Sequence, residues 1–154
     1  MPHIHDKIDF TVEVFIIYKN MVLLRKHDKY QIWLSVGGHV ELDEDPNQAA
    51  VREVKEEVGL DIELYDNGIH PTAFTETYTE LIPPVFMNRH RINPTHEHIS
   101  MTYFARTKTD KLMLSETEKT DNCRWFTSED IKLATDINSD IKHYALKALE
   151  TLKE

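Results

Sequence analysis

One segment, from Gly38 to Leu60, constrains the fold of this chain more than any other part of the sequence. Its residues predict a helix from Pro46 to Val58. Asp45 suits the N-cap of this helix, and Gln48 completes a capping box with it. Pro46 suits the first helical position, and Gly59 suits a left-handed stop at the C-terminal end. The local signals at both ends therefore agree on where the helix begins and ends.

Charge is unevenly distributed around this helix. At about 100° per residue, Glu53, Glu56 and Glu57 fall on one face. The other side, which we expect to pack, holds Val51, Val54 and Val58. Crowded carboxylates repel each other by roughly 0.2–0.5 kcal/mol per pair, so a purely structural helix gains nothing from them. A divalent cation reverses the sign of that interaction, and Mg²⁺ typically binds between carboxylates and substrate phosphates. The helix therefore indicates phosphate chemistry.

The segment resembles, position for position, the signature of the Nudix hydrolases: Gly, five residues, Glu, seven residues, Arg-Glu-apolar-x-Glu-Glu-x-Gly-apolar. The matching residues are Gly38, Glu44, Arg52, Glu53, Val54, Glu56, Glu57, Gly59 and Leu60. The resemblance implies an α+β fold, in which a mixed β-sheet is sandwiched between α-helices within one domain spanning residues 1–154. It also implies hydrolysis of the pyrophosphate bond of a nucleoside diphosphate linked to another group X.

The same resemblance implies roles for individual residues. The metal ligands that it implies are the Gly38 carbonyl and the carboxylates of Glu53, Glu56 and Glu57. The metal would be Mg²⁺, with Mn²⁺ as a substitute, and it would polarise phosphoryl oxygens and lower the pKa of a bound water. Glu44 would support the site from the preceding loop. Arg52 lies four residues before Glu56, so we expect it to orient and neutralise the glutamates rather than to contact substrate.

The identity of the general base is left open, because in families that resemble this one it is a glutamate of the helix or of a later loop. Glu97 precedes the apolar stretch Ile99–Ala105, so it would stand at a strand entrance and add a catalytic carboxylate and metal ligand. Glu116 and Glu118 lie on a loop before the expected strand Asn122–Phe126. All three also fit solvated loop carboxylates. We expect Glu97→Gln to lower activity more than Glu116→Gln or Glu118→Gln.

Substrate-binding residues must come from outside the motif. Trp33 could stack on a base, although an aromatic residue in a strand is more often part of the core. Arg89 and Arg91 could hold a terminal phosphate, although they also suit a solvated loop. Tyr78 weakly resembles a tyrosine of dinucleoside polyphosphate hydrolases. These four residues are candidates for contacts with the nucleotide or with the group X.

Histidines suggest a further set of contacts. His39 follows Gly38, and His96 and His98 flank Glu97. Imidazoles are common zinc ligands, but no cysteine or third histidine lies at a ligand-like interval from this His-x-His pair. We therefore do not expect a structural zinc site. Contacts from His39 and His98 to phosphate or substrate are the preferred functional interpretation.

Composition limits the cellular setting and the partners. A chain of 154 residues fits one domain, and its net charge of −9 argues against binding to a nucleic-acid duplex or an anionic membrane. Cys123 is the only cysteine, and the N-terminal residues do not resemble a secretion signal, so a cytoplasmic protein is expected. A small-molecule nucleotide is the expected partner, and a homodimer is left open.

Periodicity and turn residues predict the remaining elements. The expected strands are Val12–Tyr18 and Met21–Arg25, joined by a tight turn at Lys19 and Asn20, then Gln31–Leu34 leading into a loop at Gly37 and Gly38, Leu60–Tyr65, Thr72–Tyr78 and Ile99–Arg106. A long connection with Pro83, Pro84 and Pro94 precedes the last of these. A short helix is expected from Ser128, and a final helix from Ser139 should pack through Ile141, Ala145, Ala148 and Leu152.

Two functions other than hydrolysis are compatible with the fold. An isopentenyl diphosphate isomerase would need a catalytic cysteine in the cleft, and Cys123 in a late strand is a poor candidate. A nucleotide-binding regulatory domain without turnover would not need every carboxylate of the motif. Hydrolysis therefore leads, with nucleoside triphosphates, oxidised nucleotides, ADP-ribose or nucleotide sugars, and dinucleoside polyphosphates all open as substrates.

Overall fold

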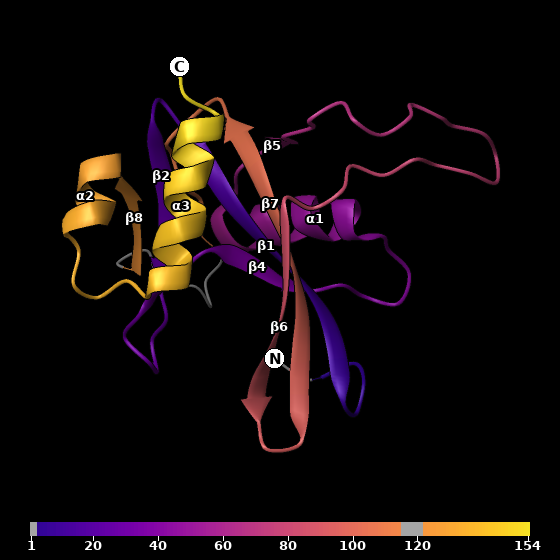
Figure 1. Cartoon of the computed structure of the whole chain (residues 1–154), viewed down its shortest axis with the longest axis horizontal. Coiled ribbons are helices and arrows are strands. Elements are labelled where there is room, and N and C mark those ends of the chain that lie inside the picture. The colour runs from indigo at the N-terminus through magenta and orange to yellow at the C-terminus, as the bar shows by residue number, and fades with distance from the viewer. Residues whose placement is uncertain (1–2, 115–121) are drawn as a thin grey trace.

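The computed structural model describes residues 3–114 and 122–154, and it has the expected α+β architecture. A mixed β-sheet lies between α1 (Pro46–Val58) on one face and α3 (Ser139–Thr151) on the other (Figure 1). The short helix α2 (Ser128–Leu133) lies at the edge of the sheet, beside its last strand. The prediction of a mixed sheet between helices is therefore confirmed.

The sheet is built around β1, which pairs in parallel with β7 and antiparallel with β2 and β4. Strands β5 and β6 pair antiparallel with β7, and β3 and β8 pair antiparallel with β2. The strands are β1 (Ile8–Tyr18), β2 (Met21–Lys26), β3 (Trp33–Leu34), β4 (Val36–His39), β5 (Ile62–Leu64), β6 (Phe86–Asn93), β7 (His96–Thr107) and β8 (Cys123–Phe126). The long β1–β7 pair therefore lies at the centre of the sheet and contributes side chains to both of its faces.

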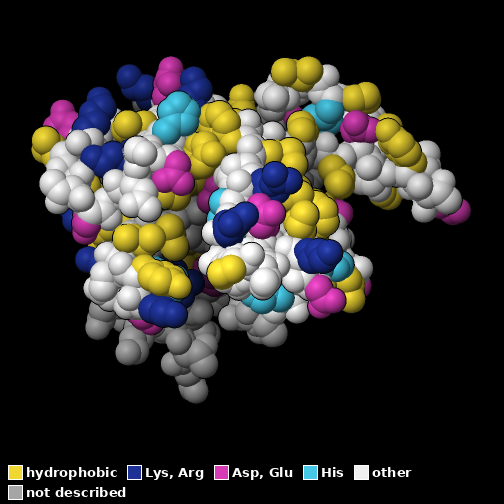
Figure 2. Space-filling view, turned by 60° about the horizontal axis from the view of Figure 1, so that its bottom comes forward, with side chains coloured by type: hydrophobic (Ala, Val, Ile, Leu, Met, Phe, Trp, Pro, Cys, Tyr) yellow, Lys and Arg dark blue, Asp and Glu magenta, His cyan; other side chains and the backbone are white. Residues whose placement is uncertain are grey.

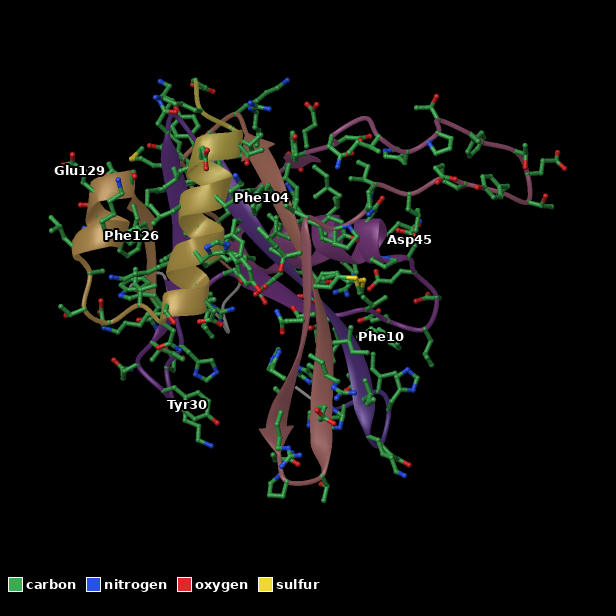
Figure 3. The ribbon with its side chains drawn as sticks, in the orientation of Figure 1. Phe10, Tyr30, Asp45, Phe104, Phe126 and Glu129 are labelled. Atoms are coloured by element: carbon green, nitrogen blue, oxygen red, sulfur yellow. The ribbon has the colours of Figure 1, made fainter. Side chains whose placement is uncertain are left out.

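Alternation along β1 separates two cores. Val12 and Val14 pack with the buried residues of α1, whereas Phe15 and Ile17 pack with those of α3. Phe104 belongs to the α3-side core, beneath that helix (Figure 3). Because successive side chains of a strand point to opposite faces, the residue number along β1 and β7 tells which helix a side chain faces.

The predicted bounds and caps of α1 are confirmed. The Asp45 carboxylate accepts a hydrogen bond from the Gln48 amide at 2.8 Å, and the Gln48 side chain accepts one from the Asp45 amide at 2.9 Å. Asp45 lies at the start of the helix (Figure 3), and Gly59 ends it at a φ of 73°. The packing of Val51 was predicted wrongly, because this side chain is 44% exposed. The buried stripe passes through Ala50, Val54 and Val58, and Val51 lies at its exposed edge.

Other local predictions are confirmed. Lys19 and Asn20 have φ values of 44° and 61°, as the turn of a two-residue hairpin requires. The helix that starts at Ser128 forms with Thr127 as its N-cap. The predicted stripe of the final helix is buried, and it consists of Ile141, Ala145, Ala148 and Leu152.

Four predictions about strands and loops need correction. Gly37 and Gly38 do not form a loop, because they lie in β4 and pair with Glu13 and Val12 of β1. The predicted strand Thr72–Tyr78 does not form, and only an isolated bridge joins Phe74 to Thr79 within a largely exposed loop. This loop projects from the body of the molecule, with hydrophobic side chains along it (Figure 2).

The predicted long connection before β7 contains a strand that sequence reasoning missed. β6 is an edge strand, and most of its side chains are exposed. A run of polar residues, from Asn88 to Arg91, occupies the middle of β6, so the strand lacks the apolar periodicity that identifies a half-buried strand. The strand predicted over Gln31–Leu34 is shorter than expected, because Gln31 has a φ of 53° and pairing begins at Trp33.

Candidate active site

Arg52 is the centre of the polar network on the outer side of α1. Its Nε and Nη2 donate to the two oxygens of Glu44 at 2.9 and 2.6 Å. Its Nη1 donates to Glu53 at 3.0 Å and to Glu56 at 3.1 Å. Nη2 also donates to the main-chain carbonyl of His39 at 3.0 Å. One guanidinium thus joins β4, the following loop and two turns of α1, and its hydrogen bonds lower the pKa of the Glu44 carboxyl.

Glu53 is buried against the backbone of β4, with only 4% of the residue exposed. Burial raises the pKa of Glu53, and the neighbouring Arg52 offsets part of that rise. A Cβ atom added to Gly38 would lie 2.4 Å from Oε1 of Glu53, which is closer than two such atoms can approach. Only glycine therefore allows the Gly38 backbone and the Glu53 carboxylate to lie so close together. This pair of oxygen-bearing groups fits a hard divalent cation.

The other two glutamates of the helix differ in their surroundings. Glu57 is largely buried and forms an ion pair with Arg25 of β2, at 3.0 Å between Nη1 and Oε2. Glu56 is well exposed and is joined only to Arg52 among the ion pairs of the described residues. The predicted carboxylate face therefore runs from a buried end, against the sheet, to a solvent-facing end. A shallow hollow of about 600 Å³ lies along the exposed side, and Arg52, Lys55 and Glu56 line it.

Glu97 lies apart from this network. Its carboxylate contacts Nε of Arg89 at 3.5 Å, and it lies opposite Arg91 in the β6–β7 pair. In the sheet, Gly38 and Met101 flank the same residue of β1, and Glu97 is four residues before Met101. At about 3.3 Å per residue, Glu97 is about 13 Å from the level of Gly38 along the strand. The structure groups Glu97 with Arg89 and Arg91, and not with the helix glutamates.

Other candidates occupy different parts of the molecule. Trp33 is only 9% exposed, donates from Nε1 to Asp136 at 2.9 Å and packs against Phe126, so its place is in the α3-side core. Tyr78 lies on the projecting loop, where its hydroxyl donates to Glu80. Cys123 is half-buried in β8, opposite Arg25. Glu116 and Glu118 lie outside the described residues.

His39 and His98 belong to a buried cluster that sequence reasoning did not foresee. His39 contacts the Asp9 carboxylate at 3.3 Å, and the rings of His39 and His98 lie 5.0 Å apart. Asp9 is fully buried. Burial would raise its pKa, but hydrogen bonds from the backbone of His5 and Ile4 outweigh burial and lower it. Burial and the neighbouring imidazoles lower the pKa of His98 to about 4.

The expectation that no further ligand would join His96 and His98 rested on intervals along the chain. In the structure, ligand atoms of His3, Asp9, His96 and His98 all lie within 4.8 Å of one another. The parallel β1–β7 pair places Asp9 opposite His98. Nothing local in the sequence signals this meeting, because it depends on the pairing of two distant strands.

Comparisons with known proteins bear on the family and the fold of the chain. A family model described as "NUDIX domain" matches residues 9–147. A solved hydrolase of the NUDIX family from Clostridium perfringens is 33% identical, covers 94% of this chain and 98% of its own, and superimposes with a TM-score of 0.83. A MutT protein from Methanosarcina mazei Go1, 17% identical with a TM-score of 0.68 over 98% of this chain and 99% of its own, shares the fold.

Curated relatives match over shorter segments. A dihydroneopterin triphosphate diphosphatase from Haemophilus influenzae is 36% identical over 76 residues, which is 49% of this chain and 47% of that protein. The enzyme of the same name from Escherichia coli is 48% identical over 44 residues, or 29% of each chain. The matched segments thus span less than half of these relatives. None of the helices in the described ranges has the length and apolar character that crossing a membrane requires.

Proposed function

The chain belongs to the Nudix hydrolase family, and we propose that it uses Mg²⁺, or Mn²⁺ as a substitute, to hydrolyse a nucleoside diphosphate linked to another group X. The proposed activity is that of a pyrophosphohydrolase, and it is supported by the NUDIX domain match, by the solved NUDIX-family hydrolase and by the diphosphatases that match part of the chain. The observation that carries the metal-dependent mechanism is the close approach of the Gly38 backbone to the Glu53 carboxylate, beside the network that Arg52 organises.

The proposed metal site consists of the Gly38 carbonyl and the carboxylates of Glu53, Glu56 and Glu57. When bound, the metal would lower the pKa of a water molecule and polarise the phosphoryl oxygens. Arg52 holds Glu53 and Glu56 in place through charge-assisted hydrogen bonds. Because the guanidinium is engaged with carboxylates and a main-chain carbonyl, it acts as a positioning residue. Glu44 fixes the orientation of that guanidinium from the loop.

Arg25 has a corresponding role on the other side of the site. Its ion pair with Glu57 joins the last turn of α1 to β2. A carboxylate held by a cation keeps its charge when it is buried, which favours ionised oxygen ligands over protonated ones. The proposed site therefore has a positioning cation at each end, Arg52 toward the loop and Arg25 toward the sheet.

A triphosphate of a nucleoside or of a pteridine is the first candidate for the substrate. Support comes from the curated relatives, which are named for dihydroneopterin triphosphate and match parts of this chain. Arg89 and Arg91 on β6 offer guanidinium groups beyond the helix glutamates, where a substrate could be contacted. Glu97 is proposed to position Arg89. His39 and His98 are less suited to phosphate contact because they lie beside the buried carboxylate of Asp9.

Product analysis tests the proposal. The wild-type protein is incubated with Mg²⁺ and a panel of nucleoside and pteridine triphosphates, oxidised nucleotides, ADP-ribose, nucleotide sugars and dinucleoside polyphosphates. Glu57→Gln should lower kcat by at least about 10² and leave the fold intact. Neutralising this proposed metal ligand would weaken metal binding and, with it, the stabilisation of charge in the transition state. Glu63→Gln replaces the exposed middle residue of β5; it is the matched control and should retain full activity.

The outcomes separate the candidate functions. Turnover of one substrate class, lost in Glu57→Gln and kept in Glu63→Gln, supports hydrolysis and identifies the class. Activity of Glu57→Gln within tenfold of wild type would contradict the metal assignment. Tight binding of one ligand without turnover of any would favour a regulatory domain instead.

A further inference from the structure

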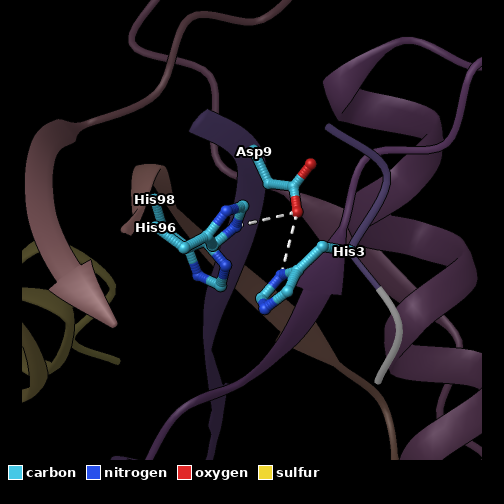
Figure 4. Close-up of side chains that lie close together, drawn as sticks. All are labelled: His3, Asp9, His96 and His98. Carbon is cyan, nitrogen blue, oxygen red and sulfur yellow. Dashed lines mark hydrogen bonds and ion pairs between the residues drawn. The ribbon is translucent and has the colours of Figure 1, made fainter. Parts of the chain in front are cut away.

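A second group of metal-ligating side chains lies on the sheet face opposite α1. His3, Asp9, His96 and His98, here called the Asp9 cluster, come together where β1 and β7 begin (Figure 4). Asp9 has the same parity along β1 as Phe15 and Ile17, which pack on the α3 side. The helix glutamates contact the other face. The cluster is therefore separate from the proposed Mg²⁺ site.

Asp9 Oδ2 has more neighbours than a single oxygen accommodates by hydrogen bonding. It lies 3.1 Å from His3 Nδ1, 3.3 Å from His39 Nε2 and 3.1 Å from His96 Nε2. The backbone amide of Ile4 also donates to it at 3.2 Å. Three ring nitrogens and one amide thus converge on an atom with about two lone pairs. Such convergence of nitrogens around a carboxylate oxygen is the environment that a cation would stabilise.

The hydrogen bonds of His96 limit which nitrogen of its ring carries a proton. Its Nδ1 lies 3.2 Å from the carbonyl oxygen of Asp6, and only a protonated nitrogen can bond to a carbonyl. In the neutral ring, Nε2 then carries a lone pair that faces Asp9 Oδ2. That contact requires either an additional proton or a cation between the two groups. A ring whose Nδ1 donates to a carbonyl while Nε2 binds a metal is a common arrangement in metal sites.

The surroundings of His98 also indicate a bound cation, independently of the contacts around Asp9. Among the described residues, its Nε2 is shielded from solvent and meets no hydrogen-bond partner. A buried nitrogen in that state costs free energy unless another group pairs with it. The ring lies 5.2 Å from that of His96 and 5.8 Å from that of His3, between centroids. A ring nitrogen of His98 thus lies within 4.8 Å of the other ligand atoms of the cluster.

We propose that the Asp9 cluster binds one divalent transition-metal ion, with zinc as the best match, through three imidazoles and one carboxylate. Imidazole ligands favour zinc over Mg²⁺, which prefers oxygen. Ligand atoms of a tetrahedral zinc site lie about 3.3 Å apart, given bonds of about 2.0 Å. The two contacts of 3.1 Å between Asp9 and the rings of His3 and His96 are close to that spacing. All four ligand atoms lie within 4.8 Å of one another, and binding of the ion would draw them to that spacing.

The ion would fasten the segment before β1 to the sheet. His3 lies on that segment, whereas Asp9 and His96 lie on the paired strands β1 and β7. The backbone amide of His5 donates to Asp9 at 2.7 Å, so the carboxylate that binds the metal also holds the segment directly. His39, from β4, contacts the same carboxylate and would keep it oriented. The site has a structural role, and its ligand class differs from that of the catalytic metal.

The test uses the full chain without any affinity tag, freed of metal with a chelator and kept in excess Mg²⁺. Titration with Co²⁺, followed by visible absorption, and with Zn²⁺, followed by calorimetry, should show about one tight site per chain. Zinc should also raise the Tm, because it binds the folded state. His3→Gln and His96→Gln should each lower zinc affinity at least about tenfold.

Two variants serve as controls. His70→Gln removes a histidine that pairs with Asp66 on the exposed loop, and it should bind zinc like wild type. Glu57→Gln, which weakens the proposed Mg²⁺ site, should also keep the zinc affinity. His3 is partly exposed, so its replacement tests the proposal even where His96→Gln fails to fold. Absence of zinc and cobalt binding, or an unchanged affinity in His3→Gln, would overturn the proposal and leave a hydrogen-bond network around Asp9.

Discussion

Arg52 forms a two-pronged contact with Glu44, in which Nε and Nη2 donate to Oε2 and Oε1 at 2.9 and 2.6 Å. The contact joins a helix to the loop before it, and the third guanidinium nitrogen is left for Glu53 and Glu56. The planar fork, and not merely the positive charge, makes this division of bonds feasible.

Arg52→Lys should therefore lower kcat/KM by about 10- to 100-fold, because an ammonium group cannot serve three carboxylates in a fixed plane. Steady-state kinetics with the substrate identified in the panel measures this. Lys55→Gln removes an exposed ion pair to Asp61 from the same helix and should stay within about twofold of wild type. Full activity of Arg52→Lys would show that charge alone is sufficient.

Gly38→Ala should weaken the metal site without changing any ligand type. The added Cβ would meet the Glu53 carboxylate at 2.4 Å, so that the carboxylate or β4 must move. We expect the Mg²⁺ concentration for half-maximal activity to rise at least about tenfold. Gly68→Ala lies on the exposed loop, where the added Cβ meets no atom within 4 Å; its φ of 73° strains an alanine locally, but the Mg²⁺ requirement should stay that of wild type. An unchanged Mg²⁺ requirement would count against the Gly38–Glu53 site.

Glu97→Gln should have a smaller effect than Glu57→Gln. Strand register places Glu97 about 13 Å from the level of Gly38, so neutralising it should leave Mg²⁺ affinity within about threefold of wild type. KM for the substrate should rise instead, because Arg89 loses its carboxylate partner. A loss of Mg²⁺ affinity equal to that of Glu57→Gln would restore Glu97 as a metal ligand.

Glu53 makes the metal-free protein sensitive to pH. Its pKa is raised by burial, so folding favours the protonated carboxyl. The stability from this group is fully present below the unfolded value of 4.5 and is lost as pH rises through the higher folded value. Glu53→Gln removes that loss.

Urea denaturation with a chelator present tests the sign. The variant should gain stability relative to wild type between pH 4.5 and neutrality, while its activity with Mg²⁺ falls. A variant that becomes progressively less stable than wild type over the same range would show that the ion pair with Arg52 outweighs burial.

Local and non-local features of the structure differ in how well the sequence predicts them. The bounds of α1 follow from Asp45, Pro46 and Gly59, because capping acts within a few residues. The polar edge strand β6 has no apolar period, so its pairing with β7 had no signature in the sequence. The Asp9 cluster depends on the parallel register that sets Asp9 opposite His98, and no interval along the chain encodes it.

Because Gly38 and His39 are neighbours in a strand, they face opposite sides of one sheet. The thickness of a single backbone therefore separates an oxygen-rich site from a nitrogen-rich one. One residue inserted into β4 before Gly38 would move the Gly38 backbone away from Glu53 and turn the His39 imidazole to the α1 face, so it would disturb both proposed sites together. If both proposed sites bind metal, the length of this short strand is constrained by each of them.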